Sequence, residues 1–438
     1  MPSTSKKLSP DLHIVLEGGQ RAYAPGETVI GRVERRYPVT CPLAIVTVSL
    51  YGRATTIAPG TKSDDLGQLK LIDGDLNTHE VFQGPLHIPK RESQEWPFVI
   101  EIPTHIDPRS LPRQATGDEE WTFLPLPRDQ GILGTLPPSF EGSSYLSYAH
   151  VEYWVQATLN LLGQAHSGRA TALLPILVSP LHLGPPITDM GLQFASKLHH
   201  VNSFHLSPAR PNNPLSTSDK FKRIFKPRTP VPFTFDMEVG FPSRIQLDNP
   251  NPIPFQLRAI PKETESDSDT RRMPETLKLK TVDLIVATHV HTRNKDGSES
   301  WTLKTNLQTE RATSSQYNQY EIPIAKDQPP LDIGREINLK VKLEPADDSY
   351  KTYLRPMFET YNIRISHSLR WSVRYEIAGK VLEAEASQAI QVLPPSGDGQ
   401  ENPAAPPPSY ETSQSMTRPP HYDGSDSGIT REDIKVVK

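Results

Sequence analysis

Two short motifs near the end of the sequence have the residue types and spacing of a binding site. Each consists of two adjacent prolines, one variable residue and a tyrosine, as Pro407-Pro408-Ser409-Tyr410 and Pro419-Pro420-His421-Tyr422. Adjacent prolines hold the backbone close to polyproline II, so little conformational entropy is lost when the segment lies across an aromatic groove. A tyrosine two positions later can fill a neighbouring pocket, as in the proline-rich ligands of WW domains. The residues predicted to bind WW domains are Pro407, Pro408, Tyr410, Pro419, Pro420 and Tyr422.

Chance is the alternative origin of these motifs, because proline-rich tails generate such patterns. With 45 prolines and 14 tyrosines among 438 residues, random placement gives roughly 0.15 matches per chain, and local proline enrichment raises this several-fold. Two copies twelve residues apart favour a binding role. The stretch 402–422 has no aliphatic face and is broken by prolines, which predicts a displayed, disordered tail over residues 395–438.

A second cluster combines positive charge with apolar side chains, the mixture typical of segments that lie on an anionic membrane surface. Its basic residues, the candidates for membrane contact, are Lys220, Lys222, Arg223, Lys226 and Arg228, interleaved with Phe221, Ile224 and Phe225. The cluster falls in a polar, proline-containing range, residues 187–229, which we interpret as a basic linker. The alternative is a solvated linker whose few apolar side chains pack locally.

Histidine pairs are the nearest approach to a metal or catalytic site in this sequence. His289 and His291 are two residues apart and should project from one face of a strand, but zinc requires three or four ligands, and no third ligand is evident. His199 and His200, within the predicted linker, are weaker candidates. The sequence contains no Walker loop, no His-Glu-x-x-His helix and no Gly-x-Ser-x-Gly turn. We therefore expect no enzyme, no metal and no cofactor.

Composition indicates a cytoplasmic protein and argues against nucleic acid as a partner. The formal net charge is −4, whereas a general nucleic-acid binder is strongly basic. The single cysteine, Cys41, excludes an intramolecular disulfide framework, and no Asn-x-Ser/Thr glycosylation site occurs. Residues 1–10 lack the apolar region of a signal peptide, and the apolar stretches 43–51 and 170–183 are too short or too broken by proline to span a bilayer. Any membrane contact is expected to be peripheral.

The elements around these motifs are predicted to be β-strands. Short β-branched runs, separated by turn residues such as Ala24-Pro25-Gly26-Glu27, fill residues 12–178, and longer alternating runs fill residues 231–392. Residues 53–80 are polar and are interpreted as a solvated loop. The clearest alternation predicts a strand with Val29, Gly31 and Val33 on its buried face. Its solvent-exposed face is predicted to carry Ile30, Arg32 and Glu34.

The fold class is therefore all-β, with two immunoglobulin-type β-sandwiches in tandem. The predicted ranges are a disordered N-terminus at 1–11, a first sandwich at 12–186, the linker at 187–229, a second sandwich at 230–394 and the tail at 395–438.

The order of the strand motifs resembles that of arrestin-fold proteins over residues 12–393. Tyr23-Ala-Pro-Gly-Glu-Thr-Val-Ile-Gly-Arg-Val33 is similar to the family's early strand pair. Later family motifs are matched by Trp96-Pro-Phe-Val-Ile-Glu-Ile-Pro103, Leu136-Pro-Pro-Ser-Phe140 and Val151-Glu-Tyr-Trp-Val-Gln-Ala157, and residues 355–369 resemble the closing strands of the arrestin C-terminal domain.

With its Pro-Pro-x-Tyr tail, the chain resembles the fungal arrestin-related trafficking adaptors. The resemblance implies a non-enzymatic bridge: the sandwiches bind a plasma-membrane transporter or receptor, and the tail recruits a HECT-type ubiquitin ligase through its WW domains. The cargo is then ubiquitinated and endocytosed, at the plasma membrane and endosomes. The alternatives are an arrestin-like scaffold for ambient-pH or stress signalling at endosomes, and a β-sandwich hydrolase. The sequence does not match the charged polar core or the clathrin-binding tail of visual and β-arrestins.

Overall fold

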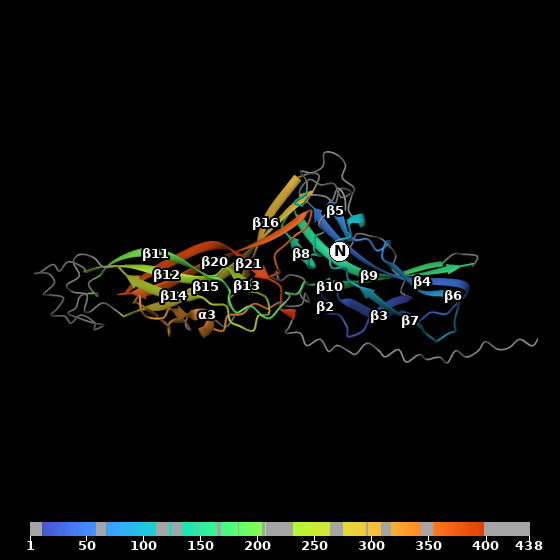
Figure 1. Ribbon diagram of the computed structural model, residues 1–438, viewed down its shortest axis with the longest axis horizontal. Coiled ribbons are helices and arrows are strands. Elements are labelled where there is room, and N and C mark those ends of the chain that lie inside the picture. The colour runs from blue at the N-terminus through green and yellow to red at the C-terminus, as the bar shows by residue number, and fades with distance from the viewer. Residues whose placement is uncertain are drawn as a thin grey trace, which may run out of the picture. The chain divides into compact units, whose positions relative to one another are not determined.

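The computed structural model of the chain (Figure 1) describes residues 11–57, 67–110, 122–124, 134–145, 147–163, 168–182, 184–203, 206, 231–262, 275–294, 297–307, 317–342 and 354–397. Regular structure in these ranges is almost entirely β, which confirms the predicted all-β class; η1 (Pro108–Ser110) and α3 (Ile333–Glu336) are short helices. No helix in the described ranges is long and apolar enough to cross a bilayer.

The first sheet pair is formed by residues 12–178. Its strands are β1 (Leu12–Leu16), β2 (Ala22–Tyr23), β3 (Thr28–Arg35), β4 (Val39–Ile57), β5 (Gly67–Ile72), β6 (Thr78–Ile88), β7 (Gln94–Glu101), β8 (Phe140–Ser143), β9 (Tyr148–Leu162) and β10 (Gly168–Val178). The smaller sheet has the order β1-β3-β7, and the larger has the order β2-β10-β9-β4-β5, with β6 paired to β4 and β8 paired to β9. The long strands β4 and β9 run antiparallel at its centre.

The second sheet pair is formed by residues 192–393. Its strands are β11 (Leu192–Ser203), β12 (Val231–Pro242), β13 (Arg244–Gln246), β14 (Gln256–Pro261), β15 (Thr276–Asn294), β16 (Gly297–Asn306), β17 (Glu321–Pro323), β18 (Leu331–Asp332), β19 (Phe358–Glu359), β20 (Ile363–Ile377) and β21 (Lys380–Leu393). One sheet has the order β11-β12-β14-β18, and the other has the order β13-β21-β20-β15-β16, with β17 and β19 paired to β15 and β20.

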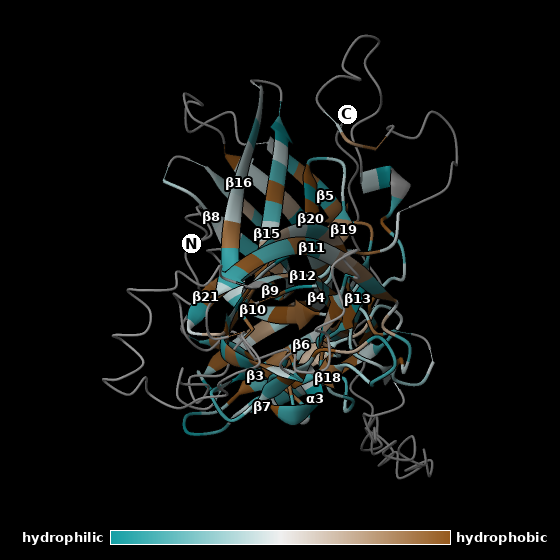
Figure 2. Cartoon of the chain, turned by 90° about the vertical axis from the view of Figure 1, so that its left-hand side faces the viewer, coloured by the Kyte–Doolittle hydropathy of each residue, from teal (hydrophilic) through white to brown (hydrophobic). Residues whose placement is uncertain are grey.

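Each sheet pair has its own hydrophobic core. In the first, Val29 and Phe98 of the smaller sheet share a buried cluster with Val46 and Val155 of the larger sheet. A separate cluster fills the second pair. Hydrophilic and hydrophobic residues alternate along long strands such as β15 (Figure 2), so one face of each such strand is turned to a core. Burial of apolar area at about 25 cal/mol per Å² then holds the sheets together in a β-sandwich-like arrangement.

The early motif around residue 26 folds as its residue types require, with one exception. Gly26 has φ +86° in the turn before β3, and a Cβ on Gly31 would lie 2.6 Å from the Val15 carbonyl oxygen, so both positions favour glycine. Glu34, predicted to be exposed to solvent, is buried, and both carboxylate oxygens accept hydrogen bonds from Arg36, at 2.7 and 2.9 Å, which compensate for lost hydration.

Two of the predicted loop ranges contain strands. The range 53–80, predicted to be a solvated loop, holds the end of β4, all of β5 and the start of β6. The range 187–229, predicted to be a linker, contains β11, which pairs with β12 over its whole length. In both places polar residues interrupt the apolar ones, and β11 leaves Phe194 and Leu198 exposed. Pairing with neighbouring strands, not local hydrophobicity, determines the conformation.

The sheet pairs are joined by an apolar contact and by buried hydrogen bonds. Val290, Ile363 and Ile365 of the second pair belong to the hydrophobic cluster of the first. The Asn362 side chain, fully buried, donates from Nδ2 to the carbonyl of Gly67 at 2.8 Å and to that of Ala54 at 3.4 Å. Because unsatisfied buried polar groups are costly, these bonds hold the β20 end against the β4 and β5 ends.

Candidate partner-binding surfaces

The binding residues predicted from sequence lie outside the described residues. This holds for all six WW-binding residues, in 401–438, and for all five basic residues, in 207–230. The structure does show what carries the basic cluster: β11 and β12 are antiparallel neighbours with Ser203 opposite Val231. The cluster is therefore carried by the connection between two strands of one sheet, not by a link between the two sheet pairs.

The two histidine pairs occupy sheet positions with local partners. His289 accepts or donates at both ring nitrogens, with Thr302 Oγ1 3.1 Å from Nδ1 and Ser368 Oγ 2.9 Å from Nε2. Burial lowers the pKa of His291, and the nearby His289 and Arg364 lower this pKa further. His199 lies in β11, not in a linker, and stacks on Phe235. Among the described residues, no group of three or more His, Cys, Asp or Glu side chains could hold a metal ion.

The first sheet pair has a further candidate surface on the outer side of its larger sheet. Alternate residues of β4 and β9, such as Ala54 and Tyr153, are buried in the core, so their neighbours point outward. Register places Tyr51 opposite Trp154 and Arg53 opposite Glu152. We call this surface the aromatic–acidic face; its residues are Tyr51, Arg53, Thr55, Glu141, Tyr148, His150, Glu152 and Trp154.

Stacking and an ion pair order the centre of the aromatic–acidic face. The rings of Tyr51 and Trp154 are stacked, with centroids 5.3 Å apart and planes 5° from parallel. The Arg53 guanidinium carbon lies 5.2 Å from the Trp154 ring centroid, and Arg53 Nε donates to Glu152 Oε1. The Tyr51 hydroxyl donates to Asp75 Oδ1 at 3.0 Å. These cross-strand contacts restrict the rotamers of large side chains that would otherwise be mobile.

Burial shifts the pKa values of three titratable groups of the face in the direction that favours their neutral forms. Burial lowers the pKa of His150, and the carboxylates of Glu152 and Glu141 oppose this shift without reversing it. Burial and the nearby Glu141 and Glu152 carboxylates raise the pKa of Tyr148 to about 12. Burial and the hydrogen bond to Asp75 raise the pKa of Tyr51 to about 12. The two phenols are therefore hydrogen-bond donors, and the charge of the face comes from its carboxylates and Arg53.

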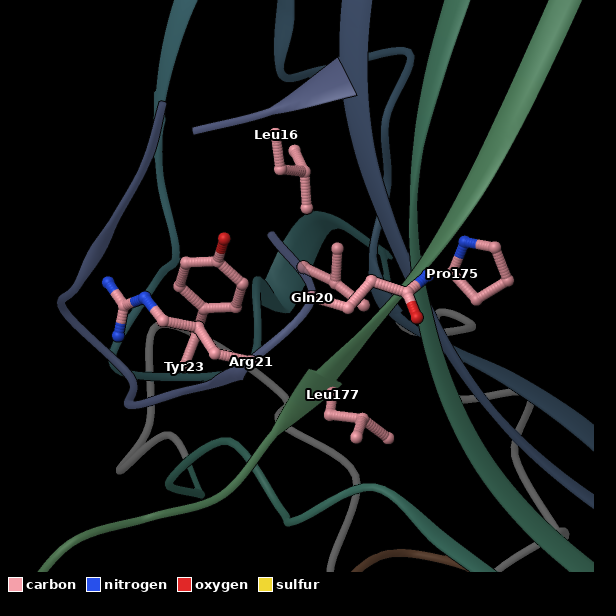
Figure 3. A pocket seen from close by; sticks show the side chains of 7 residues that line it. Leu16, Gln20, Arg21, Tyr23, Pro175 and Leu177 are labelled. Carbon is pink, nitrogen blue, oxygen red and sulfur yellow. The ribbon is translucent and has the colours of Figure 1, made fainter. Parts of the chain in front are cut away.

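A small hollow near β1 is the other candidate (Figure 3). Its volume is about 180 Å³, and it is lined by Leu16, Gln20, Arg21, Tyr23, Pro175, Ile176 and Leu177. The Arg21 guanidinium lies over the Tyr23 ring, 4.3 Å from its centroid, and Arg21 Nη1 is 2.6 Å from Glu27 Oε1. Because its cation is already paired and most of its other walls are apolar, the hollow suits an aliphatic side chain.

Comparison with protein-family models and with curated proteins finds no match to this chain. The candidate surfaces therefore depend on geometry and on the sequence motifs. The aromatic–acidic face was not predicted from the sequence, although one signal was present: polar and aromatic residues alternate with small or apolar ones in both 51–55 and 148–152.

Proposed function

We propose that this chain is a non-enzymatic adaptor of the arrestin-related trafficking type. Its β body binds the cytoplasmic side of a plasma-membrane transporter or receptor, and its tail recruits a HECT-type ubiquitin ligase, so that the cargo is ubiquitinated and endocytosed. The observation that carries the proposal is the pair of Pro-Pro-x-Tyr motifs ending at Tyr410 and Tyr422.

The described architecture supports the body half of the proposal. Two sheet pairs in series, each with its own core, provide large outer sheet faces on which partners can dock. The motifs that resemble arrestin strands have structural roles here: Phe140 is buried at the start of β8, and Ser139 N donates to the Val178 carbonyl at 2.7 Å. They position the strands and leave recognition to the outer faces and the tail.

Two motifs on one tail give a thermodynamic advantage. Eight residues separate Tyr410 from Pro419, and they span at most about 30 Å when extended. If the ligase has adjacent WW domains within this reach, the second contact is intramolecular and raises avidity by roughly 10²-fold. The basic cluster at 220–228 would add peripheral contact with an anionic membrane, where the cargo is located.

Binding of the full chain to a tandem WW-domain fragment of a HECT-type ligase tests the proposal. Calorimetry should show stepwise weakening for Tyr410→Ala and Tyr422→Ala and loss of binding for the double variant. Tyr37→Ala, at a half-exposed tyrosine in the first sheet pair, is the matched control and should bind as the native chain does. If the native chain does not bind, the recruitment half of the proposal is wrong, and the endosomal scaffold becomes the better explanation.

A further inference from the structure

The aromatic–acidic face and its border carry excess negative charge. Glu141 and Glu152 lie on the face, Asp73 and Asp75 border it beside β5 and Tyr51, and the cations among them are Arg53 and Lys70. Lys70 Nζ is 2.9 Å from Asp73, and Arg53 is bonded to Glu152, so both cations are already neutralised. Four carboxylates against two cations leave the exposed Glu141 and Asp75 for a partner of positive charge.

Aromatic side chains lie beside these carboxylates and add a second way to bind cations. The contact between Arg53 and Trp154 shows that a guanidinium fits against this indole. Tyr145, at the turn between β8 and β9, is 97% exposed. Two hydrogen bonds between Ser144 and Ser147, at 2.8 and 3.0 Å, hold that turn in place. Tyr145 is therefore an exposed aromatic side chain close in sequence to Glu141, on a turn with a hydrogen-bonded backbone, and tyrosine is enriched among interface residues that contribute strongly to binding.

The Thr55 hydroxyl is an independent sign of a missing partner. Thr55 is only 7% exposed, and its Oγ1 has no hydrogen-bond partner. Register places Thr55 between His150 of β9 and Gln68 of β5, in the row that ends at Glu141. A buried hydroxyl without a partner lowers stability, and a polar group supplied by a ligand would remove that cost.

We propose that the aromatic–acidic face binds an extended, Lys- and Arg-rich segment on the cytoplasmic side of the membrane-protein cargo. Cytoplasmic segments next to membrane spans are enriched in these residues, so their charge complements the face. Basic side chains pair with Glu141 and Asp75 and contact Tyr145, while a backbone group reaches Thr55. This inference depends on the proposed adaptor function, for which it names the chemistry of the cargo.

Fluorescence anisotropy with the full chain tests the inference. The probe is a labelled ten-residue peptide of alternating lysine and serine, and the comparison peptide has glutamate in place of lysine. The variants are Glu141→Lys and Tyr145→Ala. The matched control is Glu101→Lys, which makes the same charge change at an exposed carboxylate of β7, in the other sheet. Because all three sites are exposed, the substitutions should leave the thermal unfolding midpoint of the chain unchanged. If Glu141→Lys lowers this midpoint, Glu141→Gln is used in its place.

The lysine peptide should bind and the glutamate peptide should not, with affinity that falls as salt is raised. Glu141→Lys should weaken binding by about 10-fold or more and Tyr145→Ala by several-fold, while Glu101→Lys changes it by less than about 2-fold. Equal loss in both charge variants would mean a general charge effect, and equal binding of the two peptides would mean no charge recognition; either result overturns the inference. WW-domain binding by the same samples shows separately whether the adaptor proposal holds.

Discussion

Acidification should destabilise the second sheet pair through one buried histidine. His367, on the inner face of β20, is 3% exposed, and its Nδ1 is 3.1 Å from Thr288 Oγ1. Burial lowers the pKa of His367 from 6.5 to about 4, and a hydrogen bond with the Arg355 backbone opposes this shift only in part. Between these two pH values the unfolded chain binds a proton that the folded chain does not. The free energy of unfolding is therefore not reduced by this histidine above pH 6.5, and it decreases as the pH falls towards 4.

The magnitude follows from the separation of the two pKa values. One pKa unit corresponds to about 1.4 kcal/mol, so the shift from 6.5 to about 4 is worth at most about 3.4 kcal/mol in the free energy of unfolding. Between pH 7 and pH 5, about 2 kcal/mol of this should be lost.

Urea unfolding followed by tryptophan fluorescence at pH 7, 6 and 5 provides the measurement. His367→Gln retains an amide that can bond Thr288 but removes the titration, so its free energy of unfolding should fall by about 2 kcal/mol less than that of the native chain over this range. His13→Gln, at an exposed histidine of β1, is the control and should follow the native chain. Parallel pH profiles for the native chain and His367→Gln would refute the assignment of this loss to His367.

Two further predictions concern contacts between strands. A double-mutant cycle with Arg53→Met and Glu152→Gln, measured by chemical denaturation, should give a coupling energy of about 1–2 kcal/mol. Both side chains are only 18% exposed, so either substitution leaves the remaining side chain partly buried without its ion-pair partner. A coupling energy near zero would mean that solvent fully screens the pair. Asn362→Ala should lower the free energy of unfolding by about 1–3 kcal/mol, since it removes the buried amide that donates to the Ala54 and Gly67 carbonyls of the first sheet pair. The control Asn202→Ala, at an exposed position of β11, should lower the free energy of unfolding by less than about 0.5 kcal/mol. Equal losses for the two variants would contradict the role of Asn362 in joining the two sheet pairs.

Strands with strong local alternation were predictable from sequence. Within the range 231–392, where long alternating strands were predicted, the structure has the long strands β15 and β21. In β21 apolar residues recur at nearly every second position, and in β15 they do so on both sides of a bulge between Leu279 and Thr281. That period is a property of the strand itself. The turn at Gly26 was also predictable because it is a local feature: its positive φ depends on the residue type at one position.

The strands missed from sequence are those in which polar residues interrupt the apolar pattern. The end of β4 contains Arg53 and Thr55, and β11 contains Gln193, Ser196 and Lys197, so both runs read as solvated segments. Their conformation is determined by hydrogen bonding to β9 and β12, which are distant in sequence. Local propensity does not contain that information.

The same distinction separates the two binding surfaces. The Pro-Pro-x-Tyr motifs are defined by sequence alone, because proline restricts its own backbone and the tyrosine follows at a fixed spacing. The aromatic–acidic face exists only in the folded chain: about a hundred residues separate Tyr51 from Trp154 and Arg53 from Glu152, and antiparallel register brings them into contact. Short-range stereochemistry thus determined the tail motifs, whereas long-range strand pairing determined the face.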